Sequence, residues 1–246
     1  MFVAKQYSEK HQIPYYECDT TQFLKIPTLV KMLIKTSGAQ SDALGVSDEF
    51  MASLGLGWII LQHDIFIKRL PKAGETITVT TEAESYNKFF CYRHFWVHDE
   101  AGNECVFMNT TFSIMDLETR KMGSVDDEVL APFESEKIKR IRRGEKTLPL
   151  ETVHGEKEYT VRYYDIDMNK HVNNSVYLDW AVDSLDAAFL MAHTPEKIVV
   201  KFNKEVLYGN KIKSEYQLDD DGISRHNIIS KNDNSAEVTI TWKSLD

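Results

Sequence analysis

The same order of predicted elements occurs twice in this chain of 246 residues, about 140 residues apart. Each occurrence has an apolar helical segment, a long strand, a glycine turn and a meander of further strands. The predicted helices cover residues 24–44 and 172–191, and the predicted strands cover residues 56–70, 76–86, 89–98, 104–116, 197–207, 211–218, 224–231 and 235–243. A period this long exceeds that of solenoid repeats, so the pattern predicts a duplicated domain.

We expect an α+β chain with a first repeat over residues 1–133, a basic linker over residues 134–152 and a second repeat over residues 153–246. The linker concentrates the basic side chains Lys137, Lys139, Arg140, Arg142, Arg143 and Lys146. One interpretation is a solvated linker helix. The other is a docking patch for an acidic partner, centred on Lys139, Arg140, Arg142 and Arg143, because such a patch speeds encounter.

Composition excludes some classes of function. The formal net charge of -9 disfavours nonspecific nucleic-acid binding, which depends on basic side chains that neutralise phosphates. We expect no membrane span, because no stretch approaches ~18 consecutive apolar residues. The three cysteines form no CxxC pair, and the first residues do not resemble a secretory signal. We therefore expect a reduced, cytoplasmic protein with no metal and no cofactor.

A dense polar run precedes the second predicted helix. Within ten residues it carries Asp165, Asp167, Asn169, His171 and Asn174. Polar groups gathered at the mouth of a buried helix are costly to desolvate. That cost is easier to explain if the groups do chemistry, although Asp165 can equally serve only to form a turn.

The first repeat carries a weaker version of this run. Sliding one repeat onto the other places Asp19 on Asp167, and Thr21 and Phe23 on Asn169 and His171. The strand segments 66–69 and 202–205 also match, which pairs Arg69 with Glu205. We therefore expect chemistry in the second repeat alone.

The run Asp-x-Asp-x-Asn-x-His-Val-Asn-Asn over residues 165–174 resembles the signature of the acyl-acyl-carrier-protein thioesterases of plants and bacteria. Trp58, Pro71 and Gly74 resemble the first-domain strand of that family, and Lys204-Glu205 before Gly209 resembles its second-domain strand. The resemblance implies a double (tandem) hot-dog fold, in which each repeat is an antiparallel sheet wrapped around a long central helix. It also implies hydrolysis of fatty acyl-acyl carrier protein, which releases free fatty acid and ends chain elongation.

The resemblance places the active-site residues at Asp167, Asn169, His171 and Glu205. Many plant members carry a cysteine directly after this glutamate, but this chain has Val206 there. No cysteine lies in the second repeat. A cysteine nucleophile is therefore difficult to sustain.

Thioester hydrolysis needs an activated water and donors aimed at the developing oxyanion. Glu205 is the candidate base, although as a strand residue it could simply face water. Asn169 can donate to the thioester carbonyl or position the water, and His171 can pass a proton to the leaving thiolate. Asp167 can orient either one.

Three further residues are candidates for substrate binding. The backbone N–H groups near Asn173 and Asn174 could complete an oxyanion hole at the start of the helix. Helix capping is the simpler role for these two asparagines. Trp58 joins them because it lies in the first-repeat segment that resembles the family.

Alternative functions are an acyl-CoA thioesterase, which performs the same chemistry on the same phosphopantetheine arm, a non-catalytic acyl-binding module, and a hot-dog hydratase. The Asn-x-His order and Glu205 disfavour the hydratase. The preferred partner is acyl carrier protein. Chain-length preference, the carrier and homodimerisation stay open, as does the choice between Glu205 and Asn169 in positioning the water.

Overall fold

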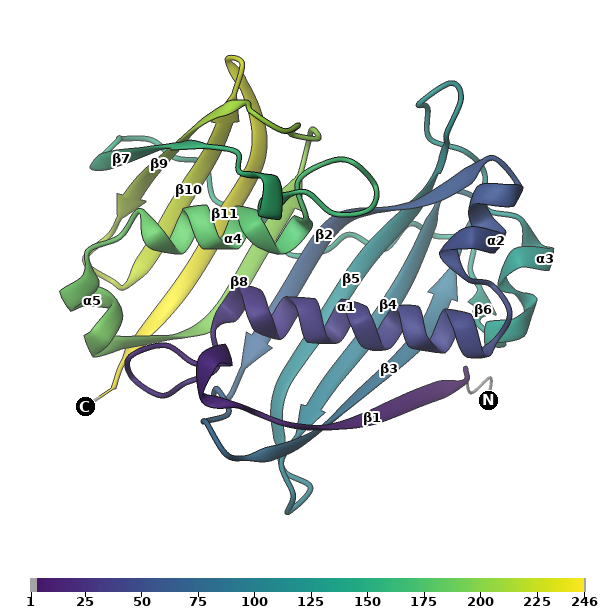
Figure 1. The fold of residues 1–246 in the computed structure, drawn as a ribbon, viewed down its shortest axis with the longest axis horizontal. Coiled ribbons are helices and arrows are strands. Elements are labelled where there is room, and N and C mark those ends of the chain that lie inside the picture. Colours follow the sequence, from purple (N-terminus) through teal and green to yellow (C-terminus); the bar gives the residue numbers. More distant parts are fainter. Residues whose placement is uncertain (1–3, 246) are drawn as a thin grey trace.

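The computed structural model describes residues 4–245 and contains one continuous, strongly curved antiparallel sheet (Figure 1). The path through the sheet runs β1-β3-β4-β5-β2-β8-β11-β10-β9-β7, and the short β6 pairs with β3 in parallel. The strands before β7 belong to the first repeat and the rest to the second. Both repeats therefore contribute to one sheet, and α1 and α4 lie side by side on its concave face.

The first repeat contains β1 (Gln6–Gln12), η1 (Tyr15–Glu17), α1 (Ile26–Ala43), α2 (Asp48–Ser53), β2 (Leu56–Ile67), β3 (Thr76–Tyr86), β4 (Phe90–His98), β5 (Glu104–Asp116), α3 (Asp127–Leu130), η2 (Ala131–Phe133) and β6 (Glu136–Lys137). The second contains β7 (Gly155–Thr160), η3 (Tyr163–Asp165), α4 (Asn174–Asp183), α5 (Ala187–Ala192), β8 (His193–Phe202), β9 (Lys211–Leu218), β10 (Ile223–Ser230) and β11 (Asp233–Ser244).

The two repeats meet where β2 pairs with β8. The register runs from Gln62 opposite Lys201 to Phe66 opposite Lys197. A single apolar core continues across this junction and includes Leu29 and Leu33 of α1 together with Val176 of α4. Burial of this shared core couples the two repeats energetically.

The helix predicted over residues 172–191 is divided into α4 and α5. The Ser184 hydroxyl donates to the carbonyl of Ala181 at 2.7 Å, which competes with continued helical pairing. The Asp186 carboxylate then accepts the N–H of Ala188 at 2.7 Å and caps α5 as a new helix. The break turns α5 away from the axis of α4 (Figure 1).

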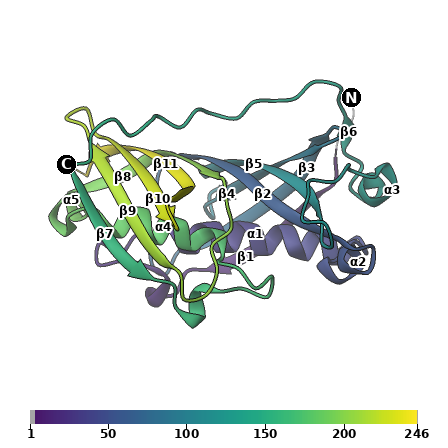
Figure 2. The same ribbon diagram turned by 90° about the horizontal axis from the view of Figure 1, so that it is seen from above.

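The interpretation of the linker as a helix is wrong. Residues 138–154 are extended and run across the outer face of the sheet, opposite the helices (Figure 2). Their backbone polar groups bond to side chains of the sheet. The N–H of Arg142 donates to the Tyr92 hydroxyl at 2.9 Å, and Gln217 accepts the N–H groups of Glu151 and Thr152 at 2.9 and 3.0 Å.

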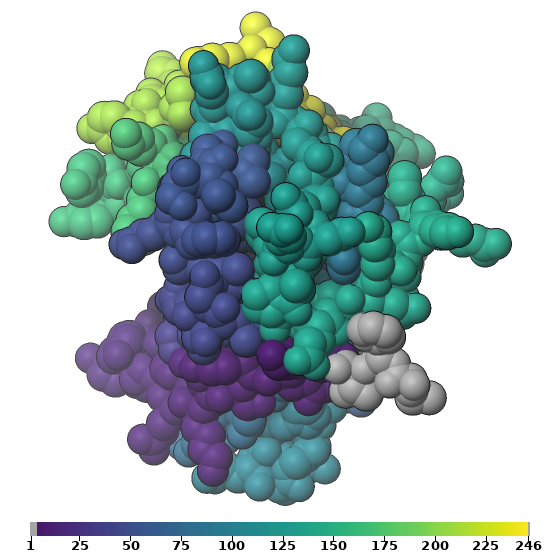
Figure 3. Space-filling view, turned by 90° about the vertical axis from the view of Figure 1, so that its right-hand side faces the viewer, coloured from purple at the N-terminus to yellow at the C-terminus, as the bar shows by residue number. Residues whose placement is uncertain are grey.

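A second apolar cluster closes the far end of the first repeat. Met51 of α2 packs there with Val129, Leu130 and Phe133. In the space-filling view the blue segment around α2 lies against the teal segment that carries α3 and η2 (Figure 3). This cluster ties α2 to the end of the repeat.

Candidate active site

The polar run forms a tight turn before α4. The N–H of Asp167 donates to the carbonyl of His171 at 3.1 Å, and the N–H of Lys170 donates back to the carbonyl of Asp167 at 3.0 Å. Lys170 has a φ of 68°, in the left-handed region. The Asp167 carboxylate also accepts the backbone N–H of Asn169 at 2.9 Å. Together these bonds hold the turn in one conformation while the Asn169 amide stays exposed.

His171 and Glu205 face each other. The His171 side chain is 20% exposed, and its Nε2 lies 4.0 Å from Oε1 of Glu205. Its Nδ1 lies 3.2 Å from the carbonyl oxygen of Val172, which can only accept a hydrogen bond. Nδ1 therefore carries the hydrogen in the neutral ring, and Nε2 presents a lone pair toward the carboxylate.

The chain after β8 brings Glu205 to this position. The N–H of Val172 donates to the carbonyl of Val206 at 2.9 Å, and the Tyr177 hydroxyl donates to the carbonyl of Lys204 at 3.3 Å. These bonds anchor the segment on both sides of Glu205 to the start of α4. Burial raises the pKa of Tyr177, and the nearby charges of Glu205 and Asp167 raise it further.

Arg120 of the first repeat also contacts the Glu205 carboxylate. Arg120 follows β5, has a φ of 55° and donates a short, charged hydrogen bond to Oε2 of Glu205. Oε2 of Glu205 is therefore bonded to Arg120, and Oε1 is the carboxylate oxygen that faces His171. The sequence prediction missed Arg120, because nothing local in a surface turn indicates a partner 85 residues away.

Asn173 is the N-cap of α4. Its Oδ1 accepts the N–H and the hydroxyl of Ser175 at 3.1 and 2.8 Å, while its Nδ2 donates to Asp167 at 3.2 Å. Asn174 is the first residue of the helix. The buried Asp165 accepts the N–H of Arg162 at 2.8 Å and pairs with its guanidinium, as expected of a turn former.

Trp58 lies in β2, partly buried, with its ring edge-to-face against Phe112 at 6.3 Å between centroids. The antiparallel register of β2 with β8 directs this end of β2 toward the chain that leaves β8 for Glu205. The candidate site therefore lies at the boundary between the repeats. The site also lies near α2. Burial raises the pKa of Asp48 in α2, and the charges of Asp42 and Asp167 raise it further.

The first repeat reproduces the backbone of this turn but not its candidate catalytic side chains. The N–H of Asp19 donates to the carbonyl of Phe23 at 2.9 Å, that of Gln22 donates to Asp19 at 3.0 Å, and the Asp19 carboxylate accepts the N–H of Thr21 at 2.8 Å. Gln22 has the same φ, 68°, as Lys170. These bonds match Asp19, Thr21 and Phe23 to the positions predicted.

The predicted match of Arg69 with Glu205 is wrong by one residue. The N–H of Leu24 donates to the carbonyl of Pro71, as that of Val172 donates to Val206. The counterpart of Glu205 is therefore Leu70, which directly precedes Pro71. Arg69 instead pairs with Glu75 and Asp99 at the edge of its own repeat.

Neither a metal site nor a membrane-spanning helix is found among the described residues. Among residues 4–245, no group of three or more His, Cys, Asp or Glu side chains is arranged to hold a metal ion. Over the same range no helix has both the length and the apolar character required to cross a membrane.

Family models and individual proteins of known sequence both match this chain. Residues 4–133 match the model of the acyl-ACP thioesterase N-terminal domain, and residues 150–244 match that of the C-terminal domain. An oleoyl-acyl carrier protein thioesterase of Coriandrum sativum is 25% identical over 85% of this chain. The chain spans 61% of the length of that relative and 52% of a Cuphea viscosissima acyl-ACP hydrolase.

Two solved structures share the fold. A Lactobacillus plantarum protein provisionally named oleoyl thioesterase is 36% identical, with a TM-score of 0.96 over 99% of this chain and 98% of its own. The 12:0-ACP thioesterase of Umbellularia californica is 17% identical, with a TM-score of 0.86 and 97% of each chain covered. The predicted tandem hot-dog fold is confirmed. With both family domains matched in order over most of its length, the chain belongs to the acyl-ACP thioesterase family.

Proposed function

We propose that this protein hydrolyses the thioester of fatty acyl-acyl carrier protein, releases the free fatty acid and so ends chain elongation. Membership of the family supports this reaction. The observation that carries it is the His171–Glu205 pair, whose Nε2 and Oε1 atoms are 4.0 Å apart at the boundary between the repeats.

The separation suits a bridging water. A distance of 4.0 Å is too long for a direct hydrogen bond, and a water at ordinary hydrogen-bond length from both atoms fits beside them. Glu205 accepts the proton as that water attacks the thioester carbonyl carbon. The carbon–sulfur bond then breaks. The proton that Glu205 took from the water passes to the lone pair on Nε2 of His171 and from there to the leaving thiolate.

The remaining predicted residues receive supporting roles in this proposal. The exposed Asn169 amide or the backbone N–H of Asn174, the first residue of α4, stabilises the oxyanion. The N–H of Ser175 does not contribute, because the Asn173 side chain already accepts it. Asp167 orients the turn through Asn169 and Asn173. Arg120 orients Glu205.

A cysteine nucleophile is not part of the proposal. Cys18, Cys91 and Cys105 are buried in the first repeat, and burial raises the pKa of each thiol, that of Cys91 to about 12. Val206, the residue after Glu205, is fully buried. Thiolates are the reactive form of cysteine, so these three thiols are inert.

The test is turnover of an acyl-acyl carrier protein, measured as free acid released. His171→Ala and Glu205→Ala are each expected to lower kcat at least about tenfold with the fold intact, since each removes a proton-transfer group. Thr21→Ala alters the matching turn of the first repeat and serves as the control with unchanged turnover. Wild-type rates in both site variants would remove His171 and Glu205 from the mechanism. Tight acyl binding without turnover in the wild-type protein would favour a non-catalytic module.

We also propose that the acidic carrier docks through Lys139, Arg140, Arg142 and Arg143. All four side chains are exposed, and Arg142 pairs with Glu84 at 2.7 Å. The linker crosses the face of the sheet opposite the helices, so the phosphopantetheine arm must pass around the sheet to reach α4 (Figure 2). Charge reversal of Arg140 and Arg143 should raise KM for the acyl carrier but not for the matched acyl-CoA. Unchanged carrier KM would exclude the patch.

The cytoplasm is the proposed compartment, because three buried free thiols suit a reducing environment. The β2–β8 junction already pairs two hot-dog sheets within one chain. A homodimer would therefore need a different surface.

A further inference from the structure

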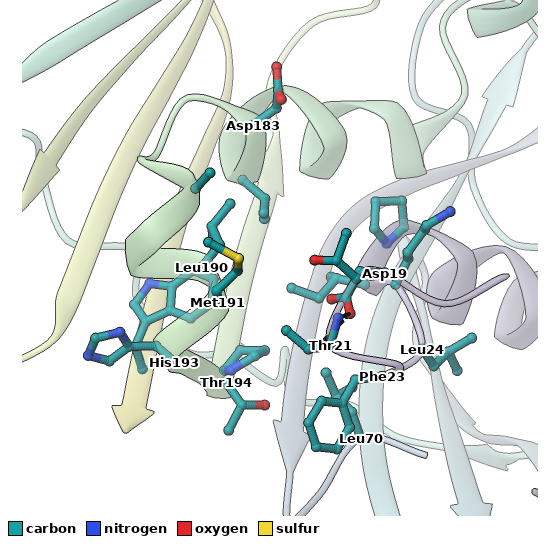
Figure 4. A pocket seen from close by; sticks show the side chains of 18 of the residues that line it. Asp19, Thr21, Phe23, Leu24, Leu70, Asp183, Leu190, Met191, His193 and Thr194 are labelled. Carbon is teal, nitrogen blue, oxygen red and sulfur yellow. Dashed lines mark hydrogen bonds between the residues drawn. The ribbon is translucent and has the colours of Figure 1, made fainter. Parts of the chain in front are cut away.

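A cavity of about 400 Å³ lies at the first-repeat counterpart of the His171–Glu205 site (Figure 4). Its walls include Asp19, Thr21, Phe23 and Leu70, which are the counterparts of Asp167, Asn169, His171 and Glu205. At this counterpart position a phenyl ring and an isobutyl group replace the imidazole of His171 and the carboxylate of Glu205.

The opposite wall comes from the second repeat. α5 follows α4 as α2 follows α1, and α5 contributes Ala187, Leu190 and Met191 to the cavity. Burial raises the pKa of Asp48 in α2, and the charge of Asp167 contributes to the rise, which places α2 near Asp167. Here α5 faces Asp19 from the other side of the cavity (Figure 4). Trp242 of β11 lies in the floor and is only 6% exposed. The cavity is thus built by both repeats and needs their docking to exist.

The lining indicates the chemistry of an occupant. Most of the wall is apolar, and the volume falls within the range of small-molecule sites. The polar residues of the lining include the carboxylates Asp19, Asp179 and Asp183, together with the basic side chains Lys25 and His193. Lys157 pairs with Asp183 at 2.6 Å, and the positive charges of Lys31 and Arg162 act on Asp179. Asp19 is therefore the carboxylate that most directly opposes an anionic head.

We propose that this cavity is a second, non-hydrolytic binding site for an unbranched alkyl or acyl chain with an uncharged head group. Phe23 and Leu70 extend the apolar wall at the positions of His171 and Glu205, so the paired imidazole and carboxylate of the proposed hydrolytic site have no counterpart at these two positions. The site is independent of the proposed hydrolysis, because it requires only the cavity and its lining.

Tryptophan quenching by a brominated chain tests the site. The probe is 12-bromododecan-1-ol, whose bromine quenches indole fluorescence on contact. The protein carries Trp58→Phe, so the tryptophan in the end of β2 that points toward the Glu205 segment no longer reports. Binding should quench Trp242, and Trp242→Phe should abolish that component.

Two substitutions on α5 provide the matched pair. Ala187→Phe projects a ring into the cavity and should weaken the quenching affinity about tenfold, because the ring takes up space that the bound chain would occupy. Ala188→Phe adds the same ring at an exposed position that does not line the cavity and should leave the affinity unchanged. At pH 8, 12-bromododecanoate should bind about fivefold more weakly than the alcohol, because the edge is acidic.

Absence of Trp242 quenching, or equal quenching in the Ala187→Phe and Ala188→Phe proteins, would overturn the second site. Tighter binding of the carboxylate would overturn the assignment of an uncharged head. Neither result bears on hydrolysis, which is measured separately with His171 and Glu205 variants.

Discussion

Two side chains distinguish the candidate active site from its counterpart in the first repeat. Phe23 stands where the second repeat has His171, and Leu70 stands where it has Glu205, although the turns around them share the same backbone hydrogen bonds. A phenyl ring and an isobutyl group can neither accept nor donate a proton. The asymmetry of the molecule therefore depends on side-chain chemistry within a conserved backbone geometry.

Arg120 gives a prediction at this scale. Arg120→Ala should lower kcat about tenfold with little change in KM, because loss of the ion pair frees the Glu205 carboxylate and small misplacements of a catalytic group are costly. Arg120→Lys should restore part of the rate, since it keeps the charge but not the guanidinium geometry. The neighbouring Lys121→Ala is the control. An Arg120→Ala enzyme with wild-type kcat would show that the pair does not position Glu205.

At the scale of elements, β2 is the strand that joins the repeats, because it pairs with β5 on one side and β8 on the other. His63 lies in its middle, opposite Thr110 of β5 and Val200 of β8. The ring is fully buried, with Nδ1 at 2.8 Å from the Thr110 hydroxyl, and desolvation lowers its pKa to about 3. His226 of β10 is similarly buried, and its pKa is also lowered to about 3.

These histidines predict acid sensitivity. The folded chain keeps them neutral down to about pH 3, whereas the unfolded chain protonates them near pH 6.5. The unfolded state therefore binds more protons between these values, so stability falls as pH drops below 6.5. At pH 5 each histidine should lower the free energy of unfolding by about 2 kcal/mol.

Urea unfolding at pH 7 and pH 5 measures this loss. His63→Leu should show a smaller loss between the two pH values than the wild-type protein, because one titrating group has been removed. An equal loss in both proteins would show that His63 does not contribute to the pH dependence.

At the scale of the whole molecule, the sheet and the core do not stop at the boundary between repeats. The core that contains Leu33 and Val176 continues across it, and the linker bonds to strands of both repeats. The candidate site and the opposite cavity each take walls from both repeats. Neither site is complete within one hot-dog.

We therefore expect a single cooperative unfolding transition. Fluorescence of Trp58 in the first repeat and of Trp180 and Trp242 in the second should follow the same urea curve, because unfolding one repeat exposes the core of the other. Single-tryptophan variants separate the signals. Two distinct midpoints would show that the repeats are stable independently.

The sequence by itself determined the duplication, the helix–strand order, the Asp-Asn-His turn and its degenerate partner. These features depend on local rules: periodic apolar residues, turn-forming polar side chains and capping asparagines act over a few residues. The resemblance of residues 165–174 to a known signature then indicated the family and Glu205. Capping, the simpler alternative for Asn173, is the role that the structure shows.

Only the tertiary structure decided the pairing of Leu70 with Glu205, the contact of Arg120, the extended linker and the cavity beside Phe23. Strand register depends on hydrogen bonds with a neighbouring strand, and a shift of one residue leaves the sequence pattern almost unchanged. Arg120 and Glu205 meet because β5 and β8 both flank β2. The linker stays extended because side chains of the sheet satisfy its backbone, a contribution that no local propensity contains.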